Sequence, residues 1–184
     1  MQFLRLFEAA NPLDYDAIAV YAYGAVDWSD DEYVVRYLQD IDEYDIEKLD
    51  SFDTKDPDFL KWFKRQIENS ADDAYREISR HMDGNTLQVY RVITAPRDWT
   101  PDSRHPGLYW SWDFKAAEAH WGSFEKSHIK WVMEATVSAD EIDWVPTLAM
   151  NSLTTYEDEK EIRIKSGVPI KITDYYEDFK GRKR

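Results

Sequence analysis

The stretch TLQVYRVI at residues 86–93 marks the point where the character of this 184-residue chain changes. Its β-branched and aromatic residues are typical of a strand. Before it, apolar residues recur at helical spacing from Asp56 to about Met82, and Asp83-Gly84-Asn85 is a typical helix end. A helical front half followed by strands predicts an α+β fold.

The part of the chain after residue 93 predicts further strands and few helices. A polar loop bracketed by prolines is expected at 96–106, and an alanine-containing helix at 113–121. Residues 139–156 have no regular pattern. Further strands are expected at 108–110, 129–137, 161–164 and 168–172, the last two joined by a Ser166-Gly167 turn.

We therefore divide the chain into an acidic helical lobe, a β-rich core and a basic tail, which together form one compact unit. The lobe comprises residues 1–83 and includes a second expected helix at about 30–38, with acids in its first turn. The core comprises residues 84–179 and the tail residues 180–184.

Composition excludes several classes of protein. A hydrophobic content of 43% is sufficient for a packed core, and the absence of cysteine excludes disulfides and zinc–thiolate sites. The four histidines have no metal-ligand spacing, so no metal site is expected. No apolar run approaches the ~20 residues that span a bilayer, and the first residues do not form a secretory signal. We expect a cytoplasmic protein without membrane contact.

The acidic charge is concentrated in the front half of the chain. The formal net charge is −14, of which residues 1–83 carry −12 and residues 84–184 carry −2. Thirteen acids against three bases lie between Asp27 and Asp58. A surface of this kind is either a solubilising face or a docking site for a basic protein, for example an antitoxin. The alternative function is therefore a non-catalytic acidic binding protein or nucleic-acid mimic.

The sequence Glu159-Lys160-Glu161 directly precedes the strand-like run Ile162-Arg163-Ile164. On an extended chain, carboxylates two residues apart point to the same side, about 6.5–7 Å apart. The isoleucines then point to the other side, into a core. Two carboxylates this close raise the pKa of one of them, which suits proton acceptance.

Arg91 in a first strand, Ser111 in a second and Glu-x-Glu before a late strand follow the order seen in the mono-ADP-ribosyltransferases, and the second half of the chain resembles that family. The resemblance implies a split β-sheet core and NAD as a substrate. Glu161 would stabilise the oxocarbenium-like ribose, and Glu159 would orient or deprotonate the acceptor. Arg91 would grip the phosphates of NAD, and Ser111 would aim the catalytic glutamate.

The resemblance leaves several points open. Glu157-Asp158-Glu159 is a second Glu-x-Glu in the same phase, although the hydrophobic run after Glu161 favours the later pair. Tyr109, Trp110 or Trp121 would stack on the cofactor. The acceptor is a macromolecule, protein arginine by default or else nucleic acid. Compact relatives occur among phage accessory enzymes and bacterial toxins, and NAD hydrolysis is an expected side activity.

Overall fold

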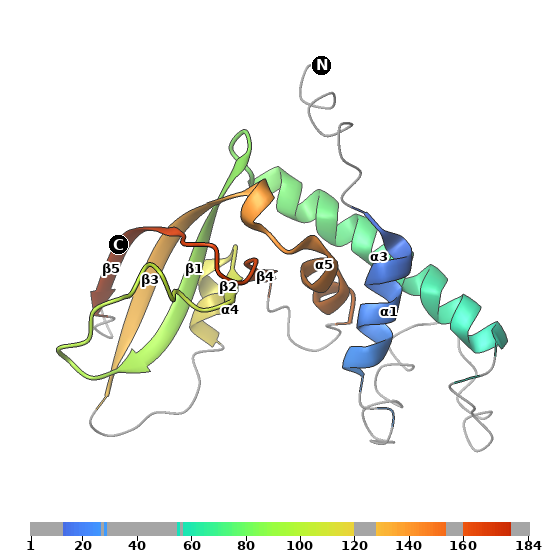
Figure 1. Cartoon of the computed structure of the whole chain (residues 1–184), viewed down its shortest axis with the longest axis horizontal. Helices are drawn as coiled ribbons and strands as arrows, with labels where there is room; N and C mark the ends of the chain where they lie inside the picture. The colour runs from blue at the N-terminus through green and yellow to red at the C-terminus, as the bar shows by residue number, and fades with distance from the viewer. Residues whose placement is uncertain are drawn as a thin grey trace. The chain divides into compact units, whose positions relative to one another are not determined.

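The computed structural model describes residues 13–26, 28, 55, 57–119, 128–153 and 160–177. These residues form helices and one antiparallel sheet, which confirms the α+β class (Figure 1). The helices are α1 (Tyr15–Ala25), α3 (Pro57–His81), α4 (Phe114–Ala119) and α5 (Trp144–Leu153), with a 3₁₀ turn, η3 (Ala139–Glu141). The strands are β1 (Thr86–Ala95), β2 (Tyr109–Ser111), β3 (Ile129–Ser138), β4 (Glu161–Arg163) and β5 (Lys171–Glu177).

The chain divides into two compact units, and the division differs from the predicted boundary at residue 83. The first unit takes in residues up to Tyr75 together with Trp144–Glu157, and the second takes in Arg76–Asp143 and the chain from Asp158. The segment Trp144–Glu157 therefore belongs to the same unit as the N-terminal residues, and the last turns of α3 belong to the same unit as the strands.

Helix α5 occupies a stretch in which the sequence predicted no regular element, so that expectation was wrong. The side chains of Asn151 and Ser152 donate to the carbonyls of Thr147 (2.7 Å) and Leu148 (2.6 Å), one turn back. Such residues are poor helix formers in isolation. Burial stabilises the helix instead, since Leu148 and its neighbour Ala149 are fully buried in the unit that also contains α1.

The sheet in the second unit has the strand order β4-β2-β1-β3-β5. Its centre is the ladder between β1 and β3, in which ten consecutive residue pairs run from Thr86 opposite Ser138 to Ala95 opposite Ile129. The predicted strands at 86–93, 108–110, 129–137 and 161–164 are confirmed to within one or two residues. The final strand begins at Lys171 instead of residue 168 and pairs with β3, so β4 and β5 lie at opposite edges.

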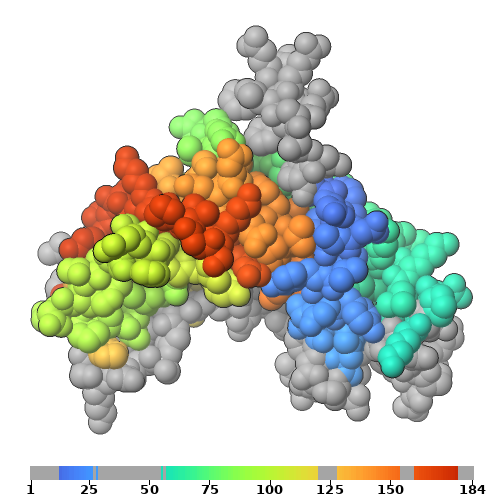
Figure 2. Space-filling view, in the orientation of Figure 1, coloured from blue at the N-terminus to red at the C-terminus, as the bar shows by residue number. Residues whose placement is uncertain are grey.

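Side chains along β1 point alternately to the two faces of the sheet. On the first, which we call the α4 face, Val92, Val132 and Ala117 of α4 form a buried cluster. The second, which we call the loop face, carries Arg91, Trp110 and Trp131. Residues 96–107 fold against this second face. The yellow-green atoms of that loop and the orange-red chain after β4 lie side by side in Figure 2.

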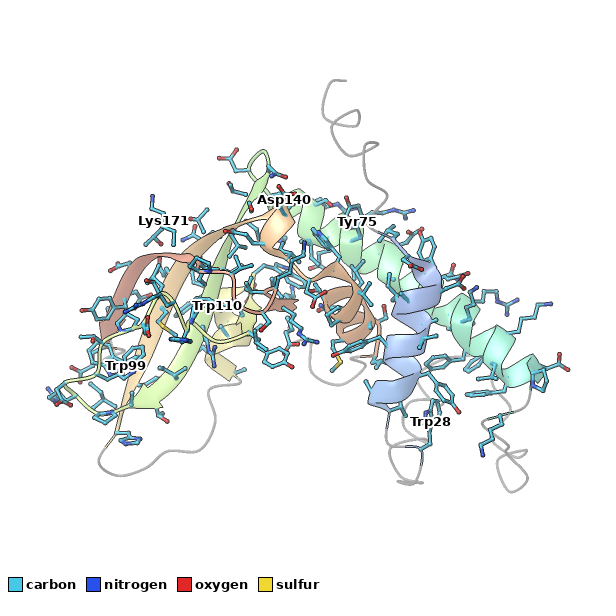
Figure 3. The ribbon with its side chains drawn as sticks, in the orientation of Figure 1. Trp28, Tyr75, Trp99, Trp110, Asp140 and Lys171 are labelled. Carbon is cyan, nitrogen blue, oxygen red and sulfur yellow. The ribbon has the colours of Figure 1, made fainter. Side chains whose placement is uncertain are left out.

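Arg91 and Gly107 fix the loop to its face of the sheet. Nη1 of Arg91 donates to the carbonyl of Pro106 (2.8 Å), and a Cβ added at Gly107 would lie 1.2 Å from Nη1. Gly107 also has φ +85°, a conformation that favours glycine. At the start of the loop, Trp99 packs on Trp131 with ring centroids 5.9 Å apart (Figure 3).

We predict that Gly107→Ala lowers the free energy of unfolding by roughly 3 kcal/mol, because it combines positive-φ strain with a clash against the guanidinium. The matched control is Gly167→Ala, which has φ +78° but nothing within 4 Å of the added Cβ. It should cost only about 1 kcal/mol. Urea denaturation measures both variants. Equal losses would mean that the contact with Arg91 relaxes without cost.

Candidate functional site

The pairing of β2 with β4 brings Ser111 opposite Glu161. The N–H of Trp112 donates to the carbonyl of Lys160 (3.2 Å), and the N–H of Ile164 donates to the carbonyl of Leu108 (2.8 Å). Hydrogen-bonded and non-hydrogen-bonded pairs alternate in an antiparallel ladder, so Ser111 and Glu161 form a pair of the second kind. In such pairs the Cα atoms are about 4.5 Å apart and the side chains are close together. Two of the predicted site residues are therefore direct neighbours.

Strand β4 is held on both of its edges. On the side away from β2, the N–H of Asp143 donates to the carbonyl of Arg163 (2.8 Å), and Ile142 and Ile164 form an isolated bridge. Ile162 is fully buried, as expected from the hydrophobic run after the Glu-x-Glu motif. The half-buried Glu161 is therefore on a strand whose position is fixed by its neighbours.

Ser111 is buried at the junction of β2 and α4, with 5% of its surface exposed. Its Oγ accepts a hydrogen bond from the N–H of Asp113 (3.1 Å), and Oδ1 of Asp113 accepts one from the N–H of Ala116 (2.9 Å) at the start of α4. These bonds turn the chain sharply from strand to helix. They fix the serine hydroxyl on the side of the sheet that α4 covers.

Ser111 and Glu161 belong to a row of polar residues that crosses the sheet. Each member is the register partner of the next, and all lie on the α4 face. We call this set the polar row: Glu161, Ser111, Tyr90, Glu134 and Asp174. The next row along the strands, on the loop face, is Ile162, Trp110, Arg91, Met133 and Tyr175. It has Arg91 as its single charged member.

Glu134 is a second ordered acid in the polar row. The hydroxyl of Tyr176 donates to its Oε1 (3.0 Å), and Nε2 of Gln88 donates to its Oε2 (3.2 Å). Its backbone lies three strand spacings from that of Glu161, about 14 Å. These bonds hold the Glu134 carboxylate near β3 and β5. Glu134 is therefore too far from Glu161 to act together with the Ser111–Glu161 pair.

Tyr90 lies between Ser111 and Glu134 in the polar row, and its surroundings change the pKa of its phenol. Burial, with the nearby carboxylates of Glu134 and Asp113 as smaller causes, raises the pKa of its phenol above the ordinary value. Its ring packs edge-on against Phe114 of α4, with centroids 5.7 Å apart. Tyr90 is therefore a neutral hydrogen-bonding group next to Ser111 at physiological pH.

Arg91 lies on the opposite face of the sheet from Ser111 and Glu161. Its register partner in β3 is Met133, and its guanidinium contacts the Pro106–Gly107 segment of the loop. Among the described residues no carboxylate pairs with it, and burial alone lowers its pKa. The structure therefore does not bring Arg91 together with the serine and the glutamate.

The predicted stacking aromatics fall in three different places. Tyr109 is 48% exposed on the α4 face opposite Arg163, whose guanidinium carbon lies 5.9 Å from its ring centroid. Trp110 is buried on the loop face, where its Nε1 donates to the carbonyl of Gly107 (3.2 Å; Figure 3). Trp121 lies outside the described residues. Tyr109 is therefore the described aromatic with surface available for stacking beside the pair.

The backbone before Glu161 departs from the extended geometry expected for the Glu-x-Glu motif. Lys160 has φ +48°, in the left-handed region, and β4 begins only at Glu161. Because Lys160 is not extended, the same-side placement of residues 159 and 161 that was expected from a strand does not follow. Glu157 and Glu159 lie outside the described residues.

Tyr90 and Glu134 were not among the residues predicted for the site. Both carried a usable signal: Glu134 is the one acid in the ten-residue strand Ile129–Ser138, and Tyr90 alternates with hydrophobic positions of β1. An isolated acid within an apolar strand needs polar partners, and here it has Tyr176 and Gln88.

The sequence also led to expectations about the acidic segment, metal binding and membrane contact. Most of the acidic segment between Asp27 and Asp58 lies outside the described residues. Within the described residues, no cluster of three or more His, Asp or Glu side chains is arranged to hold a metal ion. In that same part of the chain, every helix is too short or too polar to cross a membrane.

Comparison of the chain with protein-family models, with curated proteins and with solved structures finds no match.

We predict that Glu134→Gln lowers the pKa of Tyr90 towards its ordinary value without restoring it, because burial is the larger cause of the shift. The tyrosinate absorbance of each protein, minus that of the same protein carrying Tyr90→Phe, isolates this titration. A raised phenol pKa contributes stability that is present below the unfolded pKa of about 10 and is lost as pH rises through the folded value. An unchanged difference titration in Glu134→Gln would contradict the assignment.

Proposed function

We propose that the protein is a mono-ADP-ribosyltransferase that moves ADP-ribose from NAD to a macromolecular acceptor. The observation that carries the proposal is the direct pairing of Ser111 with Glu161, on adjacent strands and with side chains on one face. The two residues are 50 positions apart in the chain, and the resemblance assigns them to the same catalytic group. Their pairing supports the proposal because a slip of β2 by one residue would move Ser111 to the other face of the sheet, away from Glu161.

The chemistry explains why these two groups belong together. The bond between the nicotinamide nitrogen and the ribose C1′ breaks, and its electron pair leaves with nicotinamide. Positive charge then develops on the ribose, and a fixed carboxylate beside it stabilises that charge. Glu161 is the proposed carboxylate. Ser111, whose Oγ accepts the N–H of Asp113, is the proposed donor of a hydrogen bond that limits the rotamers of Glu161.

The acceptor completes the reaction by forming a bond to C1′ and giving up a proton. Glu159 is the proposed base for that proton, with a protein arginine as the proposed acceptor. Tyr109, exposed on the same face as Glu161, is the proposed surface for an aromatic ring of NAD. When water takes the place of the acceptor, the same groups hydrolyse NAD. The finer expectation of a split-sheet transferase core belongs to this proposal as well.

Arg91 gives this proposal no geometric support, because its guanidinium lies on the loop face, opposite the face that carries Ser111 and Glu161. The partly buried guanidinium donates to a carbonyl oxygen and packs on Gly107, so an anion bound there would occupy a place separate from the Ser111–Glu161 pair. The contact with Pro106 also gives Arg91 a structural role on the loop face, so its binding and stability effects must be measured separately.

We predict that Glu161→Gln lowers NAD turnover, measured as nicotinamide release, by about 10²–10³-fold, because the transition state loses its stabilising charge. Ser111→Ala should lower turnover by about tenfold, since it removes one positioning hydrogen bond. The control is Asp174→Asn, an acid of the same row at the far edge of the sheet. Label transfer from NAD in a cell lysate identifies the acceptor. Absence of both nicotinamide release and label transfer in folded wild type would refute the proposal.

We predict that Arg91→Ala lowers the free energy of unfolding but leaves the affinity for NAD in calorimetry unchanged, because the guanidinium holds the loop on the face opposite Ser111 and Glu161. The control is Arg97→Ala, an exposed arginine that pairs with Glu177 (3.2 Å). Thermal unfolding of the same samples measures the structural contribution. Weaker NAD binding by the folded Arg91→Ala variant would contradict this prediction and return Arg91 to the cofactor site.

A further inference from the structure

Lys160 adopts a backbone conformation that lysine rarely takes. Its φ of +48° lies in the left-handed region, and among the described residues it is the one non-glycine with positive φ. The Cβ atom makes this conformation unfavourable for residues other than glycine, so it persists only where surrounding contacts impose it. It also directly precedes Glu161, the proposed catalytic carboxylate.

Two contacts from separate elements hold Lys160 in place. Its Nζ pairs with Oε1 of Glu77 at 3.2 Å, and Glu77 belongs to the last turns of α3, in the same compact unit as the strands. Its carbonyl accepts the N–H of Trp112 at 3.2 Å, which continues the β2–β4 ladder one residue beyond the strand. The side chain of Lys160 is 22% exposed and that of Glu77 is 42% exposed, so the ion pair is partly shielded from water.

These contacts act on either side of the Ser111–Glu161 pair. Trp112 follows Ser111, and Lys160 precedes Glu161, so the hydrogen bond between them closes the ladder next to the pair. The left-handed residue changes the direction of the chain at the point where β4 begins. Without it, the chain would enter β4 from another direction, and the Glu161 side chain would lose its fixed place opposite Ser111.

We propose that Lys160 is a positioning residue for Glu161, held in the left-handed conformation by its ion pair with Glu77. The inference rests on the proposed function, because its importance for activity requires Glu161 to be catalytic. The structural part, that the Lys160–Glu77 pair fixes the start of β4, can be tested without any activity.

The kinetic test compares substitutions that separate charge from backbone conformation. Lys160→Met removes the charge and retains the stem, and we expect kcat for nicotinamide release to fall about 10- to 100-fold with KM for NAD unchanged. Lys160→Gly also lacks the charge but adopts positive φ without strain, so it should retain more activity than Lys160→Met. Lys160→Arg should retain most of the activity. The control is Lys171→Met, at an exposed lysine of β5 (Figure 3).

The structural test measures amide hydrogen exchange at the two ends of the β2–β4 ladder. In Lys160→Met the N–H of Trp112 should exchange about tenfold faster, while that of Ile164, bonded to Leu108 at the other end, should not change. The double variant Glu77→Lys with Lys160→Glu restores opposite charges and should slow the exchange of Trp112 again.

Unchanged Trp112 exchange in Lys160→Met would overturn the inference, as would wild-type kcat in that variant. If folded wild-type protein does not release nicotinamide, the proposed function fails, and the exchange experiment alone decides whether Lys160 fixes the start of β4. Equal activity of the Met and Gly variants would also contradict it, since the backbone conformation would then have no part in the effect.

Discussion

The antiparallel ladder between β1 and β3 is the constraint on which the rest of the second unit depends. Ten residues of each strand pair without interruption. The remaining strands extend this two-stranded ribbon, β2 and β4 beyond β1 and β5 beyond β3. Because side chains alternate along a strand, the ladder decides which residues of β1 face α4 and which face the loop at 96–107. Tyr90 and Val92 go to one face, and Arg91 goes to the other. The register of β2, β4 and β5 then assigns each of their side chains to one of these two faces.

The two faces have different chemistry as a result. The α4 face combines a small apolar cluster around Val92 with the polar row, in which the carboxylate of Glu134 accepts a hydrogen bond from the hydroxyl of Tyr176. The loop face is mostly apolar but carries Arg91 on β1 and Glu177 on β5, and the 96–107 loop folds against it. A reaction that stabilises positive charge is suited to the first face. An anion is suited to the second, where the guanidinium of Arg91 has no carboxylate partner among the described residues.

The parts of the fold that the sequence predicted well are those where local pattern and tertiary burial agree. Helix α3 and strands β1 and β3 are long and strongly periodic, so their own residues specify them. Helix α5 was missed because Asn151 and Ser152 disfavour a helix locally, and the burial of Leu148 and Ala149 outweighs that preference. The last strand was placed too early because its pairing with β3 sets its start at Lys171.

For the candidate site, the sequence by itself determined which residue types are present and on which elements Ser111, Glu161 and Arg91 lie. Only the tertiary structure decided which of them meet. Register between strands is set by loops and packing far from the residues concerned, and a shift of one residue moves a side chain to the other face. This is why Ser111 and Glu161 are neighbours while Arg91 is not. It is also why the left-handed turn at Lys160, imposed by Glu77 83 residues earlier, was not evident from the motif.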